Sequence, residues 1–267
     1  MKSKIMIAVL SLVMLMGVQN AKAWGLVGHH IVAYIAEQHL TPEAKAKCEK
    51  YLRHKVTHYS LWMDYWRHTF PYQESTHWHM THVNEDFEQI GERNNVSRDA
   101  VTQLNRIIGE MEKGKYHNMS DSVITVNLKY LIHLVGDLHC PSHVGYHKNF
   151  ELSSPKIRHG KNMYSPHTFW DSSPSWMHPK WKADSFLKVC DTYSPKQIAA
   201  IQKGTPTKWG KDCAQRMMKI YSFWGEDENT KDFTPEQRKK IDDVVFEQCA
   251  YGGYRLAAVL NNLLTKY

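Results

Sequence analysis

One apolar stretch of the chain carries a histidine and an aspartate on the face that a helix would bury. Residues 120–140 are expected to form this helix, because Ser120 can cap its start and Pro141 ends it. Its apolar residues recur at helical spacing: Val123, Val126, Leu128, Leu131, Leu134, Val135 and Leu138. His133 and Asp137 are four residues apart, so both project from that apolar face. Since a buried carboxylate without a partner is costly, Asp137 must meet a cation, a hydrogen-bond donor or a metal ion.

The rest of the chain also favours helices over strands. Further helices are expected over residues 28–40 and 60–68, and another after Ser97, which can cap it. Four more helices are expected to begin at prolines, namely Pro42, Pro195, Pro206 and Pro235, and the helix from Pro235 should run to about Leu264. Alternating strand patterns are scarce, and residues 146–179 hold Gly, Ser and Pro without periodicity, which predicts a loop. No repeat, low-complexity tract or linker divides the chain. We therefore expect a single all-α domain.

The first 23 residues have the pattern of a secretory signal peptide. Lys2 and Lys4 precede an apolar run over residues 5–18, and an A-x-A site ends at Ala23. The run is shorter than the ~20 residues that a membrane span needs. We expect cleavage after Ala23, export to the periplasm or the medium, and no stable membrane association. The mature domain would then comprise residues 24–267 and begin at Trp24.

Charge and cysteine content limit the function less than the motifs do. The chain has 34 Lys and Arg against 27 Asp and Glu, a net charge of +7, and three of the lysines lie within residues 1–23. The mature chain is therefore only mildly basic, and its net charge does not argue for nucleic-acid binding. Export permits disulfides, but five cysteines leave at least one unpaired within the chain, and no C-x-x-C motif favours a paired-thiolate metal site.

Several other segments combine histidine with aspartate at short spacing. His167 and Asp171 are four residues apart, like His133 and Asp137. Three other segments are W-G-L-V-G-H-H, which starts at Trp24 and contains His29, W-M-D-Y-W-R, which contains Asp64 and Arg67, and H-W-H-M-T-H, which contains His79 and His82. Each alone has a simpler explanation, such as a His–Asp hydrogen bond, a helix cap or a surface charge. Together they supply more imidazole and carboxylate groups than one zinc ion needs. We therefore predict two or more ions held close together, a type of site that catalyses phosphoryl displacement.

The order of these motifs resembles a known family. Five motifs follow one another between Trp24 and Asp171: W-G-x-x-G-H, W-x-D, W-H, H-x-x-G-D-x-H-x-P-x-H and H-x-x-W-D. A sixth motif, A-Y-G-G-Y-R-L-A, begins at Ala250. The pattern is similar to that of the zinc-dependent single-strand nucleases and 3'-nucleotidases of the S1/P1 type. No G-x-S-x-G, Walker-type loop or H-E-x-x-H motif supports another hydrolase class.

The resemblance implies a mostly helical domain, related to the zinc phospholipase C fold, with three zinc ions in a cleft. It assigns the first ion to Asp64, His79, His133 and Asp137. It assigns the second to His143, His167 and Asp171, and the third to Trp24, His29 and Asp137. Trp24 would bind through its α-amine and carbonyl, and that amine exists only after cleavage at Ala23.

The same resemblance implies an endonuclease that cleaves single-stranded DNA and RNA to 5'-phosphate products and also acts on 3'-nucleotides. A water or hydroxide between two ions would attack phosphorus, Asp64 would orient it, and Arg67 would lie near the scissile phosphate. A base would stack on an aromatic residue, for which Trp78, Tyr146, Tyr164 and Phe169 are candidates. The basic segment with Lys148, Lys156, Arg158 and Lys161 would contact phosphates, or else form a solvated loop. No protein partner is implied.

Three positions depart from the family pattern. His82 competes with His79 as the ligand, Cys140 stands where glutamine is usual, and Ser165 stands where the family has an asparagine that helps to bind phosphate, a role that Asn162 could take over. Two other functions remain open at this point. One is a zinc phospholipase C-like lipid phosphodiesterase, and the other is a non-catalytic exported metal-binding protein.

Overall fold

A computed structural model describes residues 24–90, 98–112, 118–146, 156–221 and 227–265. Its α-helices are α2 (Gly25–Gln38), α3 (Pro42–Leu52), α4 (Trp62–Trp66), α5 (Ala100–Glu112), α6 (Asp121–His139), α7 (Pro166–Met177), α8 (Ala183–Cys190), α9 (Pro195–Ile201), α10 (Pro206–Tyr221) and α11 (Pro235–Thr265). Short 3-10 turns are η1 (Val56–Tyr59), η2 (Gln73–His77) and η5 (Pro141–His143). The strands are β1 (Thr81–Val83), β2 (Val144–Tyr146), β3 (Lys156–His159), β4 (Asn162–Tyr164) and β5 (Asp227–Asn229). The expected all-α architecture is confirmed.

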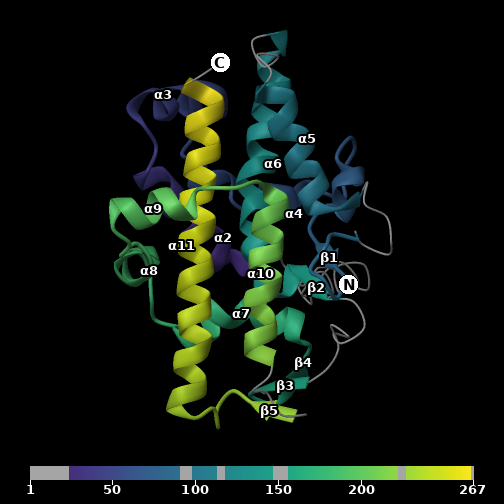
Figure 1. Cartoon of the computed structure of the whole chain (residues 1–267), viewed down its shortest axis with the longest axis vertical. Coiled ribbons are helices and arrows are strands. Elements are labelled where there is room, and N and C mark those ends of the chain that lie inside the picture. Colours follow the sequence, from purple (N-terminus) through teal and green to yellow (C-terminus); the bar gives the residue numbers. More distant parts are fainter. Residues whose placement is uncertain (1–23, 91–97, 113–117, 147–155, 222–226, 266–267) are drawn as a thin grey trace, which may run out of the picture.

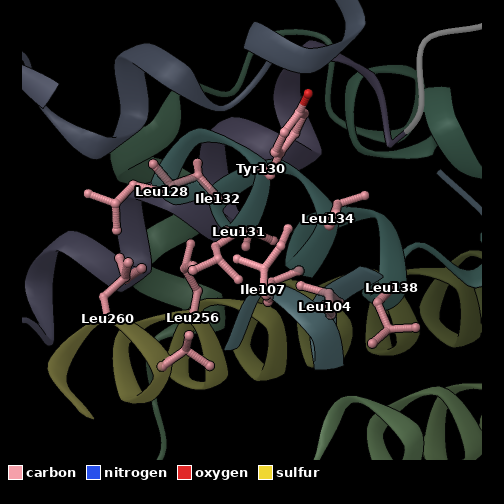
Figure 2. Packing of buried hydrophobic residues seen from close by; sticks show 14 of the residues in the cluster. Leu104, Ile107, Leu128, Tyr130, Leu131, Ile132, Leu134, Leu138, Leu256 and Leu260 are labelled. Atoms are coloured by element: carbon pink, nitrogen blue, oxygen red, sulfur yellow. The ribbon is translucent and has the colours of Figure 1, made fainter. Parts of the chain in front are cut away.

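The long helices α5, α6, α10 and α11 run along the long axis of the molecule (Figure 1). Helix α11 packs on α2, α6 and α3, and α6 also packs on α5 and α10. Figure 2 shows the resulting core, where Leu104 of α5, Leu131 of α6 and Leu256 of α11 meet. Because α6 is covered from several sides, the polar residues of its C-terminal half, His133, Asp137 and His139, lie inside the protein.

The local signals at helix ends are mostly where the sequence predicts them. Ser120 accepts a hydrogen bond from the backbone N–H of Val123 at the start of α6, and the helix ends at His139 before Pro141. Pro42, Pro195, Pro206 and Pro235 are each the first residue of a helix. Ser97 lies outside the described residues, and Asp99 instead accepts hydrogen bonds from the first N–H groups of α5.

The prediction of a loop over residues 146–179 is wrong for residues 156–179, while residues 147–155 lie outside the described part of the chain. Strands β3 and β4 form an antiparallel hairpin there, β5 pairs with β3 in parallel, and α7 follows the hairpin. Helix α7 begins at Ser165-Pro166, where Ser165 accepts from the N–H of Thr168. The same Ser–Pro start precedes α9, so a sequence signal for α7 was present. A separate two-stranded sheet joins β1 and β2 in parallel.

Two further features concern the apolar length of the helices and the state of the cysteines. No helix among the described residues is both long and apolar enough to cross a membrane. All five cysteines are buried free thiols in this structure. The predicted signal segment, residues 1–23, lies outside the described residues.

Candidate metal centre

Helix α6 brings His133 and Asp137 into the interior, where neither side chain is exposed. His133 Nε2 lies 3.2 Å from Asp137 Oδ2, and His133 Nδ1 donates to the backbone carbonyl of Ser60 at 2.8 Å. This second hydrogen bond fixes the ring orientation and leaves Nε2 facing the carboxylate. The apolar face of α6 thus carries the buried polar pair that the sequence predicts.

Three more histidines from three other segments surround Asp137. His79 Nδ1 lies 2.9 Å from Oδ2, while His143 Nδ1 and His29 Nε2 lie 3.0 and 3.3 Å from Oδ1. His79 follows η2, His143 ends η5 and His29 belongs to α2. One carboxylate therefore has four imidazoles within about one hydrogen-bond length.

Asp64 approaches the same cluster from α4. Its Oδ1 lies 3.8 Å from His133 Nε2 and 3.9 Å from His79 Nδ1. Arg67, one helical turn later, places Nη1 3.5 Å from the same oxygen, and its buried Nε has no hydrogen-bond partner. A short aromatic helix thus presents one carboxylate and one guanidinium to the site.

His143, His167 and Asp171 form a second group next to the first. His143 Nε2 lies 3.0 Å from His167 Nε2 and 3.4 Å from Asp171 Oδ1, and His167 Nε2 lies 3.3 Å from Asp171 Oδ2. Ligands held about 2.0–2.1 Å from a tetrahedral zinc ion lie about 3.3 Å apart. The spacing of the three side chains therefore matches three corners of such a site.

Trp24 joins this second group through its backbone. Its N–H donates to Asp171 Oδ1 at 2.9 Å, and its φ of 43° turns the chain sharply into α2. A Cβ on Gly28 would lie 1.9 Å from the Trp24 ring, so only glycine admits that ring. The contact of Trp24 N is with Asp171, whereas the resemblance pairs Trp24 with Asp137.

The buried polar atoms of these residues fit a metal site. The atoms without a hydrogen-bond partner include both ring nitrogens of His29, both carboxylate oxygens of Asp64, His79 Nε2, Asp137 Oδ1 and Asp171 Oδ2. Burial lowers the pKa of His79 to about 4 and also lowers the pKa of His29, which keeps both imidazoles neutral with a free lone pair. Unsatisfied buried atoms are rare in folded proteins, and metal ions bound here would give partners to the carboxylate oxygens and to one ring nitrogen of each imidazole.

All nine predicted metal-binding residues are thus gathered in one region: Trp24, His29, Asp64, His79, His133, Asp137, His143, His167 and Asp171. His82 does not join them, because its ring packs against Gly145 on the β1–β2 sheet. The geometry therefore favours His79 over His82. Whether these residues bind metal stays a prediction.

The aromatic and basic residues that the sequence suggests for substrate binding agree less well with the structure. Phe169 is fully buried in the core, Trp78 and Tyr164 are half-buried, and the Tyr146 side chain and Lys148 lie outside the described part. Among the described residues, the large exposed aromatic side chains are instead those of Tyr65, Trp66 and Phe70, with 59%, 45% and 83% of their surface exposed. They follow Asp64 directly, so their position in the sequence could have indicated them. Lys156, Arg158 and Lys161 are exposed on the β3–β4 hairpin, and Asn162 donates to Tyr164.

Comparison with known proteins identifies the family of this chain. Residues 24–265 match the model of the S1/P1 nuclease family. The chain is 23% identical to nuclease P1 of Penicillium citrinum over 90% of its length and 97% of the relative. It is 25% identical to nuclease S1 of Aspergillus oryzae over 91% and 92%, and 21% identical to endonuclease 1 of Arabidopsis thaliana over 97% and 93%. The chain belongs to the S1/P1 nuclease family.

Proposed function

We propose that this protein is a zinc-dependent endonuclease that cleaves single-stranded DNA and RNA to 5'-phosphate products and also hydrolyses 3'-nucleotides. Members of the family are hydrolases of phosphodiester bonds with a helical fold like that of zinc phospholipase C. The observation that carries the proposal is the set of buried histidine and aspartate atoms without hydrogen-bond partners, gathered from five segments of the chain. Nucleic acid is therefore the expected substrate class.

Three zinc ions are proposed, with the ligands that the family pattern assigns. The first ion would be held by Asp64, His79, His133 and Asp137. The second would be held by His143, His167 and Asp171, and the third by Trp24, His29 and Asp137. The short distances around Asp137 support its sharing between two ions. The third set requires the Trp24 nitrogen to face Asp137 after processing, because in the unprocessed chain it contacts Asp171.

The catalytic roles follow from which groups still lack partners. Zinc, when bound, polarises the phosphoryl oxygens and lowers the pKa of a water molecule. Asp64 has two carboxylate oxygens without hydrogen-bond partners, so it can orient the attacking water and accept its proton. Arg67 has a buried Nε without a partner, which a non-bridging phosphate oxygen would satisfy. The bond from phosphorus to the 3'-oxygen then breaks and leaves the phosphate on the 5' side.

The preference for single strands is proposed to come from the exposed aromatic residues next to Asp64 and Arg67. Tyr65, Trp66 and Phe70 offer ring faces to solvent, and bases stack on such rings only when they are not held within a duplex. Paired strands would keep their bases stacked on each other. The aromatic segment would therefore favour unpaired nucleotides near the scissile phosphate.

Residues 1–23 are proposed to be a signal peptide that is removed during export. Cleavage after Ala23 would turn the amide nitrogen of Trp24, a poor metal ligand, into a free amine. The family match begins at Trp24, which supports that processing site. N-terminal sequencing of the exported protein tests this; a mature chain that starts elsewhere would contradict the third ligand set.

The function is tested by assaying the purified exported protein on four substrates side by side. Circular single-stranded DNA, RNA and a 3'-nucleotide should be hydrolysed, while phosphatidylcholine should not. A chelator should abolish the activity and added zinc should restore it, with metal analysis giving three zinc ions per chain. Hydrolysis of the lipid alone would show a phospholipase C-like enzyme. Zinc binding without turnover of any substrate would show a metal-binding protein.

A further inference from the structure

Cys140 is a buried cysteine at the edge of the metal centre. It lies at the C-terminal cap of α6, three residues after Asp137 and three before His143, and none of its surface is exposed. Its Sγ lies 3.3 Å from Asp171 Oδ1, to which the thiol donates, and 3.4 Å from the hydroxyl of Ser142. The sulfur therefore faces the same carboxylate that faces His143 and His167.

A second observation, an unpartnered buried carboxylate oxygen, points to a cation site next to this sulfur. Asp171 is 96% buried, since its exposed fraction is 4%, and its Oδ2 has no hydrogen-bond partner. One potential ligand atom from each of Cys140, His143 and Asp171 lies within 4.8 Å of the others. Ligands at about 2.0 Å (oxygen) and 2.3 Å (sulfur) from one zinc ion lie about 3.5 Å apart, close to the observed distance from sulfur to Asp171.

We propose that Cys140 is a sulfur ligand of the metal ion held by His143 and Asp171. The inference rests on the proposed function in so far as both need this region to bind metal. When sulfur binds the ion, the thiol loses its proton to the buffer and the hydrogen bond to Asp171 is replaced by a shared ion. A thiolate makes the site softer, so it favours zinc, cobalt or cadmium over magnesium or manganese.

The other cysteines show that burial alone does not explain this placement. Cys48, Cys190, Cys213 and Cys249 are also buried, but among the described residues none of them belongs to a group that could hold a metal ion. Cys48 packs in the main core among apolar side chains. Cys48 therefore serves as a matched control, because it is a buried thiol that belongs to no candidate metal site.

Cobalt replacement provides the first test, because thiolate ligands give cobalt a near-ultraviolet charge-transfer absorption that nitrogen and oxygen ligands do not. The zinc-free protein is loaded with cobalt as wild type, Cys140→Ser and Cys48→Ser. The absorption should appear in the wild type and in Cys48→Ser and be lost in Cys140→Ser. Competition with a chelator should show cobalt bound at least ~10-fold more weakly in Cys140→Ser. An unchanged absorption in Cys140→Ser, or none in the wild type, would overturn the proposal.

Because Cys140→Ser could fail to fold, a second measurement uses only the wild type. X-ray absorption of the zinc-loaded protein should reveal a sulfur neighbour at about 2.3 Å. Nitrogen and oxygen neighbours alone would refute the role of Cys140. The nuclease assay separates the two conclusions. If the protein cleaves single-stranded DNA but has no zinc–sulfur contact, the proposed function is supported and the role of Cys140 as a ligand is refuted. If a zinc–sulfur contact is present without cleavage, Cys140 is supported as a ligand and the proposed function is refuted.

Discussion

Helix α6 passes through two buried polar clusters that differ in how their polar atoms are satisfied. The Arg255 cluster consists of His139, Asp212 and Arg255. There, His139 Nδ1 donates to the carbonyl of Val135 at 2.7 Å, and Arg255 Nη1 donates to His139 Nε2 at 2.9 Å. Arg255 Nε donates to the carbonyl of Ile201 at 3.0 Å, and Nη2 donates to Asp212 at 3.2 Å.

The metal centre, by contrast, leaves oxygen and nitrogen atoms without partners only two residues away along the same helix. Asp137 Oδ1 and the ring nitrogens of His29 belong to this set: none of them makes a hydrogen bond to the described residues, although His143 Nδ1 and His29 Nε2 lie 3.0 and 3.3 Å from Asp137 Oδ1. In the Arg255 cluster, burial and the neighbouring guanidinium lower the pKa of His139 to about 3, so its ring stays a neutral acceptor. Similar residue types thus form a completed structural cluster in one place and an incomplete binding site in the other.

Replacing the shared carboxylate should give the largest difference between the two clusters. Asp137→Asn removes the negative charge that faces four imidazoles, so zinc content should fall by two ions per chain. Because an ion contributes several kcal/mol to catalysis, nuclease activity should fall ~10³-fold or more. Activity and metal content are measured together. Asp99→Asn, at a buried aspartate that caps α5, should keep its zinc; full activity in Asp137→Asn would contradict the three-ion site.

Breaking the Arg255 cluster should instead affect stability. Arg255→Met leaves the buried His139 Nε2 without its donor and removes one donor from the partly exposed Asp212, which still accepts from Lys208. This change should lower the free energy of unfolding by about 3 kcal/mol. Zinc content per folded chain should not change, since none of the proposed ligands contacts Arg255. Urea unfolding and metal analysis test this. Arg216→Met, which breaks a partly exposed pair with Glu247, should cost only ~1 kcal/mol. Loss of zinc in Arg255→Met would contradict the conclusion that the Arg255 cluster has a structural role separate from metal binding.

Adding one methyl group next to His29 should disturb the metal centre through packing alone. A Cβ on Gly136 would lie 2.5 Å from His29 Nδ1, and the His29 ring already stacks on His133 at 4.1 Å between centroids. Gly136→Ala should therefore displace His29, cost ~1–3 kcal/mol of stability and lower zinc affinity. Gly109→Ala, where nothing lies within 4 Å, should stabilise α5 by ~0.5–1 kcal/mol. Equal effects of the two changes on zinc affinity would count against this account.

The smallest effect is expected at the exposed aromatic segment outside the metal centre. Phe70→Ser removes a ring face without touching a proposed ligand, so KM for a single-stranded oligonucleotide should rise ~5-fold, about 1 kcal/mol of stacking. KM for a 3'-nucleotide should change less. Val189→Ser, at an exposed apolar residue of α8, provides the control. An unchanged KM for the oligonucleotide would remove this segment from the substrate path.

Much of this protein is predictable from local patterns. Ser120 and Pro141 mark the ends of α6, the four predicted helix-starting prolines are each the first residue of a helix, and the His133–Asp137 spacing places both side chains on one buried face. These features depend on a few neighbouring residues, so sequence alone can specify them. The β3–β4 hairpin is not predictable in this way because short strands show little periodicity, whereas the Ser–Pro start of α7 is a local signal of the same kind as that of α9.

The sequence by itself determined the helical architecture, the family motifs and which residue types could bind metal. Only the tertiary structure decided which buried polar residues are completed by protein and which are not. His139 and His133 lie six residues apart on one helix, yet Arg255 satisfies the first, while the second faces a cluster with free carboxylate and imidazole atoms. The same applies to Cys140, whose place beside Asp171 depends on the packing of η5, the turn that follows Cys140, against α7. The physical reason is that hydrogen bonds and metal coordination join atoms across long sequence separations, and local patterns do not encode those distances.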